Sequence, residues 1–269
     1  MNCEICKFQN PKGTVTAIII KDNKVLLLKR NEGPFINYLD LPGGYMSKDE
    51  TPVDAIKREI KEELNVDCGA TFLRSEPGYA YWKGNKYPVI SLFYLVELQG
   101  EIKLNNENKD FVWMPIKDLI PEQIAFDTNS KIAKWLKDNF VLDLVRVREL
   151  IKQLDSTAEV NEQSLYQAII SGHIEKIYNN GKLVALGTIF PRQTILRCQA
   201  VIEDMICDEA YRGKGFGREI LRKLLKWAKE NGVEMVELTT NPKRIAANEL
   251  YKSEGFKLHP TNHYLYKVV

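Results

Sequence analysis

Three glutamates in the first half of the chain have the type and the spacing of metal ligands. Glu59, Glu62 and Glu63 stand at positions i, i+3 and i+4, so a helix would gather their carboxylates on one face. Like charges repel at that distance unless a cation offsets them. Mg²⁺ accepts oxygen ligands and leaves room for water and substrate phosphates. The cluster therefore indicates phosphate chemistry assisted by Mg²⁺ or Mn²⁺, with a solvated charged helix face as the structural alternative.

The sequence also marks the helix that must carry these glutamates. Thr51, Pro52 and Asp54 supply an N-cap, a proline in the first turn and a capping-box acid. Asn65 tolerates the left-handed backbone that ends many helices. The apolar residues that recur at helical intervals, and are expected to be buried, are Val53, Ile56, Ile60 and Leu64. The pattern predicts a helix from Pro52 to a turn at Asn65.

A longer pattern surrounds this helix in the stretch PGGYMSKDETPVDAIKREIKEELNV, residues 42–66. It resembles the Nudix box, except that Asn65 stands where glycine is usual. The residues that carry the resemblance are Gly44, Glu50, Arg58, Glu59, Glu62 and Glu63. The resemblance implies an α/β/α sandwich and hydrolysis of a nucleoside diphosphate linked to another moiety.

The Nudix resemblance also assigns roles to single residues. The implied ligands of Mg²⁺ or Mn²⁺ are Glu59, Glu62 and Glu63. Glu62 and Glu63 would also be catalytic, Glu50 would hold an outer position, and Arg58 would orient a glutamate without touching substrate. The substrate is expected to be ADP-ribose-like or a nucleotide sugar, because the segment after the box resembles part of some Nudix hydrolases. Tyr79, Tyr81 and Trp82 would stack on the base, although aromatics near strands are more often core.

The second half carries a different signature, in which a strand, Val201–Cys207, leads through a glycine-rich turn into an amphipathic helix. Such a turn presents backbone N–H groups and the positive end of the helix dipole, which suits a pyrophosphate. The turn RGKGFG, residues 212–217, fits neither a P-loop nor a dinucleotide fingerprint. An ordinary turn is the structural alternative.

The turn resembles the acetyl-CoA loop, R-x-x-G-x-G, of GNAT N-acetyltransferases. A second GNAT motif follows in ANELYKSEGF, residues 247–256. The resemblance implies acetyl transfer to a small-molecule primary amine, with acetyl-CoA as cosubstrate. The residues assigned to acetyl-CoA are Met205, Cys207, Arg212, Gly213, Lys214, Gly215, Phe216 and Gly217. Glu203 or Asp204 would be the base, and Tyr251 the acid. A strand-edge charge for either carboxylate, and a core position for Tyr251, remain open.

Length and composition bound the organisation of the chain. With 269 residues, 44% of them hydrophobic, two domains are expected, over 1–139 and 140–269. The fold class is α/β (α+β), a Nudix sandwich followed by a GNAT mixed sheet. The Nudix half should contain a hairpin turning at Asp22-Asn23, and a helix after residue 126 capped by Asp127 or Thr128.

Charge and hydropathy indicate small-molecule partners. The net charge of +2 lacks the basic excess of a nucleic-acid binder. No apolar h-region and no apolar run of about 18 residues occurs, so neither secretion nor a membrane is expected, and the location is expected to be cytoplasmic. The expected partners are a nucleotide diphosphate, acetyl-CoA and an amine. The sequence carries no signal of oligomeric state.

Five cysteines, at 3, 6, 68, 198 and 207, are odd in number and scattered, which indicates reduced thiols. Cys3 and Cys6 form one C-x-x-C knuckle without the second pair that tetrahedral zinc requires. A protein without stoichiometric zinc is therefore expected.

Two hypotheses remain for the chain as a whole. A bifunctional enzyme with two active sites is favoured, because both halves carry complete sets of catalytic residues. The alternative is that one domain is a ligand-sensing or scaffolding module that regulates the other.

Overall fold

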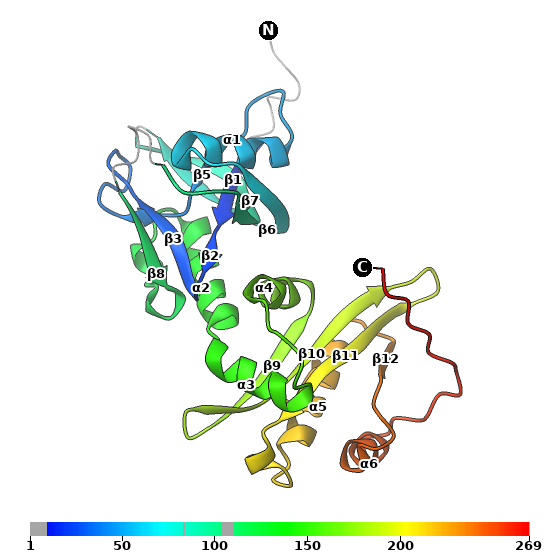
Figure 1. Cartoon of the computed structure of the whole chain (residues 1–269). Coiled ribbons are helices and arrows are strands. Elements are labelled where there is room, and N and C mark those ends of the chain that lie inside the picture. Colours follow the sequence, from blue (N-terminus) through cyan, green and yellow to red (C-terminus); the bar gives the residue numbers. More distant parts are fainter. Residues whose placement is uncertain (1–9, 83, 104–109, 269) are drawn as a thin grey trace. The chain divides into compact units, whose positions relative to one another are not determined.

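The computed structural model describes residues 10–82, 84–103 and 110–268 (Figure 1). The chain divides into two compact units, one ending at Leu144 and the other beginning at Val145. The domain boundary that the sequence predicts, after residue 139, lies one residue before the end of helix α2 (Asp127–Phe140).

The first unit is built on two small sheets. The strands of the larger sheet run in the order β5-β1-β7-β6, and they are β1 (Lys12–Ile18), β5 (Gly43–Tyr45), β6 (Cys68–Trp82) and β7 (Asn85–Leu98). β1 and β7 are parallel, and the other pairs are antiparallel. The strands of the smaller sheet are β2 (Ile20–Lys21), β3 (Lys24–Lys29), β4 (Leu39–Asp40) and β8 (Phe111–Pro115). The turn between β2 and β3 is confirmed, since Asp22 and Asn23 have φ of 50° and 57°.

Helix α1 (Pro52–Leu64) packs against β1, β5 and β6 (Figure 1). The predicted start is confirmed: Thr51 Oγ1 accepts from the Asp54 N–H at 3.2 Å and donates to Asp54 Oδ2 at 2.6 Å. Asn65 ends the helix with φ 52°, and its N–H binds the carbonyl of Lys61. The buried face of the helix consists of Ala55, Ile56, Ile60 and Leu64. The expectation for Val53 was wrong, because its side chain is 38% exposed and Ala55 supplies the buried contact in the first turn.

Helix α2 (Asp127–Phe140) closes the first unit and packs against β6 and the 3₁₀ helices η2 (Ile116–Asp118) and η3 (Pro121–Gln123). Its predicted caps were wrong. The N-cap is Phe126, which makes no side-chain cap. Asp127 Oδ1 instead accepts from the Tyr79 N–H of β6 at 3.2 Å, and Thr128 Oγ1 accepts from Ser91 of β7 at 3.2 Å. Contacts with the sheet therefore replace local capping.

The second unit is a mixed sheet with helices. The strands run in the order β12-β11-β10-β9, and they are β9 (His173–Asn179), β10 (Lys182–Gln193), β11 (Cys198–Cys207) and β12 (Met235–Leu238). The helices are α3 (Leu144–Leu154), α4 (Glu162–Ser171), η4 (Glu209–Tyr211), α5 (Phe216–Glu230) and α6 (Ile245–Ser253). Only the β11–β12 pair is parallel among these strands.

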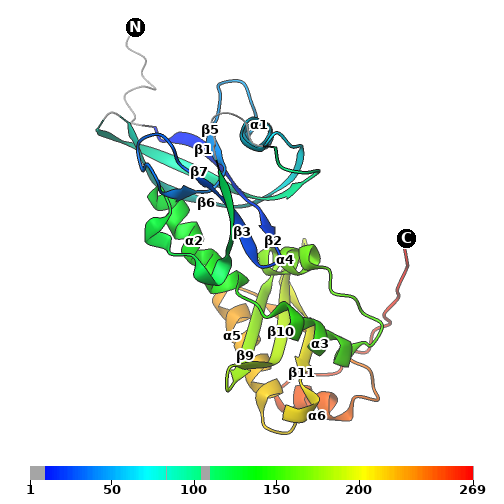
Figure 2. The same cartoon turned by 60° about the vertical axis from the view of Figure 1, so that its left-hand side comes forward.

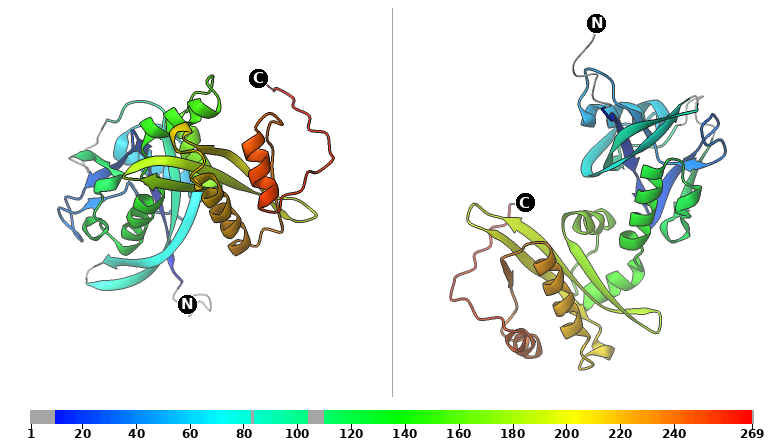
Figure 3. Two further views of the ribbon diagram at one scale, coloured as in Figure 1. Left: turned by 90° about the horizontal axis from the view of Figure 1, so that it is seen from below. Right: turned by 180° about the vertical axis from the view of Figure 1, so that it is seen from behind.

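Helix α5 runs alongside β9 and β10 (Figure 2) and buries Ile220, Leu221 and Leu224. Gly187 of β10 makes this approach possible, because a Cβ there would lie 2.7 Å from Ile220 Cγ2. Within the described residues, no further helix or strand follows α6 (Figure 3). No helix in the described part of the chain is both long and apolar enough to span a membrane.

Candidate active sites

Arg58 organises the carboxylates of α1. Its Nε and Nη2 donate to the two oxygens of Glu50 at 3.0 and 2.8 Å, and its Nη1 donates to Glu59 at 2.8 Å and Glu62 at 3.0 Å. Nη2 also reaches the carbonyl of Tyr45 at 3.0 Å. The hydrogen bonds from Arg58 are the main reason that the pKa of Glu50 falls to about 2. Arg58 therefore holds glutamates in place, as the sequence predicted.

The two glycines of β5 bring the backbone against these carboxylates. The Gly43 N–H donates to Glu63 Oε2 at 2.9 Å. A Cβ on Gly44 would lie 2.5 Å from Glu59 Oε1, and one on Gly43 would overlap the carbonyl of Val15. Any larger residue at 44 would therefore displace Glu59. Burial raises the pKa of Glu59, whose side chain is 13% exposed against 53% for Glu62.

The glycine-rich loop of the second unit is open. Gly213 and Gly215 have φ of 77° and 88°, and a Cβ on either would meet no atom within 4 Å. Gly215 is the N-cap of α5 and makes no side-chain cap. The first turn of α5 therefore begins beside empty space. Gly217 differs, since a Cβ there would make an ordinary 3.6 Å contact with Leu250.

The remaining loop residues pack locally. Arg212 Nε donates to the carbonyl of Cys207 at 3.4 Å, and its guanidinium lies 3.3 Å from Glu209. Lys214 Nζ stands 4.9 Å from the centroid of the Tyr211 ring, which also lies 6.4 Å from the ring of Phe216. The loop is thus anchored to β11 and η4 while its glycines stay uncovered.

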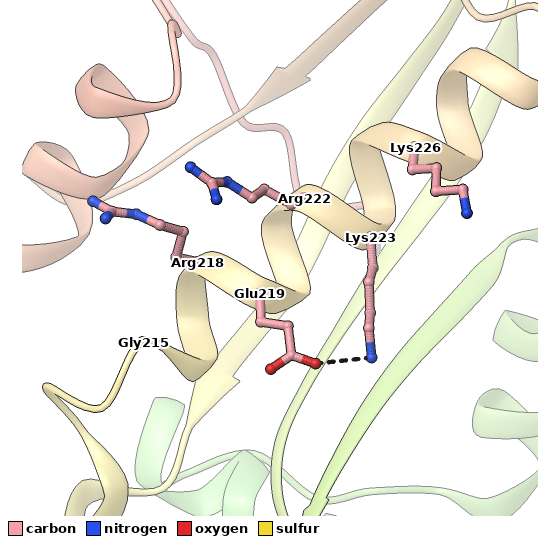
Figure 4. Close-up of a pocket in the computed structure, with 6 residues that line it drawn as sticks. All are labelled: Gly215, Arg218, Glu219, Arg222, Lys223 and Lys226. Atoms are coloured by element: carbon pink, nitrogen blue, oxygen red, sulfur yellow. Dashed lines mark ion pairs between the residues drawn. The ribbon is translucent and has the colours of Figure 1, made fainter.

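A hollow of about 350 Å³ extends from the loop along α5 (Figure 4). Its lining is mostly basic and consists of Gly215, Arg218, Glu219, Arg222, Lys223 and Lys226. Arg218 and Arg222 both reach Glu254, at 2.9 and 2.8 Å, and Lys223 pairs with Glu219 at 3.0 Å. The hollow carries more cationic than anionic groups and suits an anionic ligand.

A bulge in β11 presents the two candidate bases. Two residues, Asp204 and Met205, oppose the single Gly187, because Thr188 pairs with Glu203 and Leu186 with Ile206. Asp204 takes the left-handed φ of 48°, which marks a local bend.

The bulge lies where β11 loses one neighbour. β12 pairs only as far as Ile202 and Leu238, so β11 continues without β12 from Glu203 onward. Burial raises the pKa of both Glu203 and Asp204, and the charge of Asp204 adds to the effect on Glu203. A carboxylate with a raised pKa at an open strand edge suits a general base.

The other predicted residues, Met205, Cys207 and Tyr251, pack against the hydrophobic core of the same unit. Met205 approaches Gly187, and burial raises the pKa of the Cys207 thiol. Tyr251 of α6 is partly buried, its ring lies 6.0 Å from that of Phe256, and burial raises its pKa. Across residues 145–268, no hydrogen bond joins Tyr251 to Glu203 or Asp204.

Both halves of the chain match known families. The NUDIX domain model matches residues 11–136, and the acetyltransferase (GNAT) family model matches residues 132–256. The chain is 32% identical over 134 residues to the ADP-ribose pyrophosphatase of Methanocaldococcus jannaschii. The matched region covers 48% of this chain and 76% of that protein. The chain joins a Nudix hydrolase domain to a GNAT acetyltransferase domain.

Further relatives match one half each. The nucleoside triphosphatase NudI of Escherichia coli is 29% identical over 134 residues, covering 46% of this chain and 92% of that protein. The uncharacterized N-acetyltransferase YobR of Bacillus subtilis is 34% identical over 92 residues, or 34% of this chain. The match spans 36% of that protein, about a third of its length. The predicted family memberships and fold class are thereby confirmed.

The Nudix half fits a hard divalent ion by the chemistry of its donors. Glu59, Glu62 and Glu63 offer only carboxylate oxygens, and Glu63 and Glu59 lie beside the backbone of Gly43 and Gly44. In the part of the chain that the structure describes, no three acidic, histidine or cysteine side chains converge on one point as a metal site. Arg58 and the Gly43 N–H hold the oxygens instead. The donors suit Mg²⁺, and the metal role remains a prediction.

The remaining predicted groups are aromatic residues and cysteines. Tyr79 and Tyr81 are 44% and 41% exposed, so neither ring belongs to the buried core. The side chain of Trp82, and Cys3 and Cys6, lie outside the described residues. Cys68, Cys198 and Cys207 are free thiols.

Two buried polar residues of the Nudix half were missed from the sequence. Asp40 and Asn129 are 7% and 6% exposed and hydrogen-bonded to each other at 2.6 Å. The only sequence signal was a lone acid inside the apolar stretch YLDLP.

Proposed function

We propose that the chain is a bifunctional enzyme. Its Nudix half hydrolyses a nucleoside diphosphate linked to another moiety, with a divalent metal. Its GNAT half transfers an acetyl group from acetyl-CoA to a small-molecule primary amine. The observation that carries the proposal is that each half has its own set of catalytic side chains, drawn from one unit.

In the Nudix half, the chain's own residues place the reacting diphosphate. Glu59, Glu62 and Glu63 would hold Mg²⁺ or Mn²⁺, which when bound polarises phosphoryl oxygens and lowers the pKa of water. Gly44 lets Glu59 lie against the backbone, and Arg58 fixes the orientation of Glu59 and Glu62. Glu62 or Glu63 would accept the proton of the attacking water.

The substrate of the Nudix half is ADP-ribose-like or a nucleotide sugar. The similarity to an ADP-ribose pyrophosphatase over most of that protein's length supports this choice. The similarity to a nucleoside triphosphatase makes nucleoside triphosphates the necessary comparison. The two classes differ in whether a second moiety is attached beyond the phosphates.

In the GNAT half, the amine nitrogen attacks the thioester carbonyl of acetyl-CoA while Glu203 or Asp204 takes its proton. The carbon–sulfur bond breaks, and the leaving thiolate takes a proton from Tyr251. Burial raises the pKa of Tyr251, so its hydroxyl is protonated at neutral pH. The N–H groups from Gly213 to Gly217 would hold the pyrophosphate, and the basic hollow along α5 would take the remaining anionic part of acetyl-CoA.

A pair of screens tests the proposed function. Mass spectrometry of nucleotide diphosphates, nucleotide sugars and triphosphates with Mg²⁺ should find hydrolysis, greatest for ADP-ribose-like compounds. An acetyl-CoA consumption screen over amines should find an acceptor. Hydrolysis restricted to triphosphates would contradict the substrate class. Activity in only one screen would favour the sensing or scaffolding role for the other half.

Calorimetry with acetyl-CoA tests the loop. Gly215→Glu places a negative charge in the open space at the start of α5, so acetyl-CoA affinity should fall by at least about tenfold. The matched control is Gly181→Glu in the β9–β10 turn, where φ is 77° against 88° at Gly215, and where a Cβ likewise meets no atom within 4 Å. Equal affinity for Gly215→Glu and the unchanged protein would place acetyl-CoA elsewhere.

A further inference from the structure

Four aromatic rings gather in the Nudix half. The ring centroid of Phe35 lies 5.0 Å from that of Phe126, 5.6 Å from Tyr38 and 6.0 Å from Tyr81, all edge-to-face. Phe35 and Tyr38 come from the β3–β4 loop, Tyr81 from β6, and Phe126 from the N-cap of α2. Tyr38 and Tyr81 are 42% and 41% exposed. The aromatic cluster therefore offers ring surface to a ligand.

The backbone holds two of these rings in an uncommon conformation. Phe35 and Phe126 have φ of 71° and 62°, a region that bulky residues rarely occupy. Such conformations persist only where the surrounding structure imposes them, and they gather at ligand sites. The surrounding structure therefore holds the two half-buried phenylalanines in place.

A polar group lies directly beside the cluster. The guanidinium carbon of Arg30 stands 4.9 Å from the centroid of the Phe126 ring, and Nη1 donates to Asp40 Oδ2 at 2.9 Å. Asn129 Nδ2 donates to Asp40 Oδ1 at 2.6 Å. Burial raises the pKa of Asp40 to about 6, against the lowering effect of Asn129 and Arg30. Arg30, Asp40 and Asn129 therefore form a chain of contacts that begins at the Phe126 ring.

Asn129 leaves one acceptor unused in this set. Its side chain is 6% exposed, and its Oδ1 accepts no hydrogen bond within the described residues. Burying an acceptor without a donor costs free energy. An N–H group on a flat ring is a donor that could bind this oxygen. Because the oxygen is covered, a ligand reaches it only when residues around it shift. Most residues of the loop 31–38, which carries Phe35 and Tyr38, are exposed.

The cluster lies within reach of the carboxylates. Asp40 precedes Gly43 by three residues, so their Cα atoms are at most about 11 Å apart. The Gly43 N–H binds Glu63. A nucleotide whose phosphates lie at the α1 carboxylates can therefore extend its base toward Arg30 and Asp40.

We infer that the aromatic cluster and Asn129 form the base-recognition site of the Nudix half, selecting a flat nucleobase that carries an amino group. The base stacks against the exposed rings, and its amino N–H donates to Asn129 Oδ1. This inference rests on the proposed hydrolysis of nucleoside diphosphates. It moves base recognition from Tyr79 and Trp82 to rings that are linked through Arg30 and Asp40 to a buried acceptor.

The first test compares the binding of three ligands to the unmodified protein. ADP and the diphosphate of purine riboside differ only in the exocyclic amino group, and ribose 5-phosphate lacks the base. Dissociation constants from ligand-observed NMR without divalent metal should rise about tenfold from ADP to the purine compound, and ribose 5-phosphate should bind more weakly still. Equal affinities for ADP and the purine compound, or no binding by either, would overturn the inference.

Variants then locate the binding, since ADP is also part of acetyl-CoA. Phe126→Leu removes the ring that Phe35 and Arg30 both contact, so the ring surface that stacks on the base is no longer held in place and ADP binding should weaken roughly tenfold. The control Phe72→Leu removes a ring that is 51% exposed and touches Tyr94, outside the cluster, and should leave affinity unchanged. In Asn129→Ala, the preference for ADP over the purine compound should vanish. If Phe72→Leu weakened binding and Phe126→Leu did not, ADP would bind elsewhere.

A hydrolysis assay on the same samples separates this inference from the proposed function. Loss of the amino preference with hydrolysis intact would overturn the base site alone. An amino preference that depends on Phe126, in a protein that hydrolyses no diphosphate, would uphold the base site and overturn the proposed activity.

Discussion

Both halves of the chain place paired glycines at their candidate sites, for opposite physical reasons. Gly43 and Gly44 are required because other protein atoms already occupy the space of a Cβ, including Glu59 Oε1 at 2.5 Å. Gly213 and Gly215 are required by their left-handed φ, and a Cβ on either would meet no atom within 4 Å. The first pair brings the protein's own charges together, and the second leaves room for a ligand's charges.

The charged groups follow the same division. Arg58 is bound to Glu50, Glu59 and Glu62, so its charge organises the site. Lys214, in the GNAT loop, lies over the Tyr211 ring instead, and its ammonium still carries a charge that a phosphate can meet. The charged groups of the Nudix site therefore bind one another, whereas Lys214 of the GNAT loop can bind a phosphate of the ligand.

The largest expected effect comes from the carboxylate cluster. Glu63→Gln removes one negative charge at nearly constant shape, and hydrolysis should fall by about 10³-fold or more, since the proposed chemistry depends on that charge. Asp67→Asn is the control, because Asp67 is an exposed acid paired with Lys61 just after α1. Phosphate release from the screened substrate gives the rates. A fall of less than tenfold would remove Glu63 from the catalytic set.

The next effect concerns the GNAT acid. Tyr251→Phe keeps the ring packed against Phe256 and deletes only the hydroxyl, so acetyl transfer should fall roughly 10²-fold. Tyr264→Phe deletes a hydroxyl from a tyrosine that is 83% exposed and should change nothing. Thiol release from acetyl-CoA measures both. Unchanged turnover in Tyr251→Phe would mean that water or another group protonates the thiolate.

Alanine at one glycine of each pair tests the comparison itself. Gly44→Ala forces Glu59 to move, so hydrolysis should fall by at least about tenfold, because a shift of this size disturbs catalytic geometry. Gly213→Ala meets no atom but strains the backbone by about 1 kcal/mol, so the melting temperature should fall by a few degrees while acetyl-CoA still binds. Abolished acetyl-CoA binding in Gly213→Ala, together with unimpaired hydrolysis in Gly44→Ala, would reverse the comparison.

The smallest effect is a displaced pH profile. The pKa of Glu203 is raised above its ordinary value of 4.5, so the carboxyl stays protonated to higher pH and cannot accept a proton below its pKa. As the pH is lowered, kcat/KM for acetyl transfer should therefore fall with an apparent pKa above 4.5. This acidic limb of the pH profile should be absent in Glu203→Gln. A limb that survives Glu203→Gln but disappears in Asp204→Asn would assign the base to Asp204.

What the sequence predicted correctly was locally encoded. The start of α1 depends on Thr51 and Asp54, three residues apart, and its end on Asn65, so a short window contains both signals. The grouping of the glutamates around Arg58 follows from the same helical spacing.

What the sequence could not predict depends on distant partners. Asp127 and Thr128 were expected to cap α2, but β6 and β7 engage both side chains. The bulge that turns Asp204 depends on the register between β10 and β11. Phe35, Tyr81 and Phe126 meet from three separated segments, and no periodic pattern links them.

One sample in which both reactions run together tests the central claim that the chain holds two chemically independent catalysts. Excess EDTA is added while hydrolysis of the diphosphate and acetylation of the amine are followed in parallel. The proposed metal ligands all belong to the Nudix half, and the proposed acetyl-transfer residues need no metal. Hydrolysis should therefore stop and return with Mg²⁺, while acetyl transfer continues at its original rate. Continued hydrolysis in EDTA, or loss of both activities together, would contradict the account.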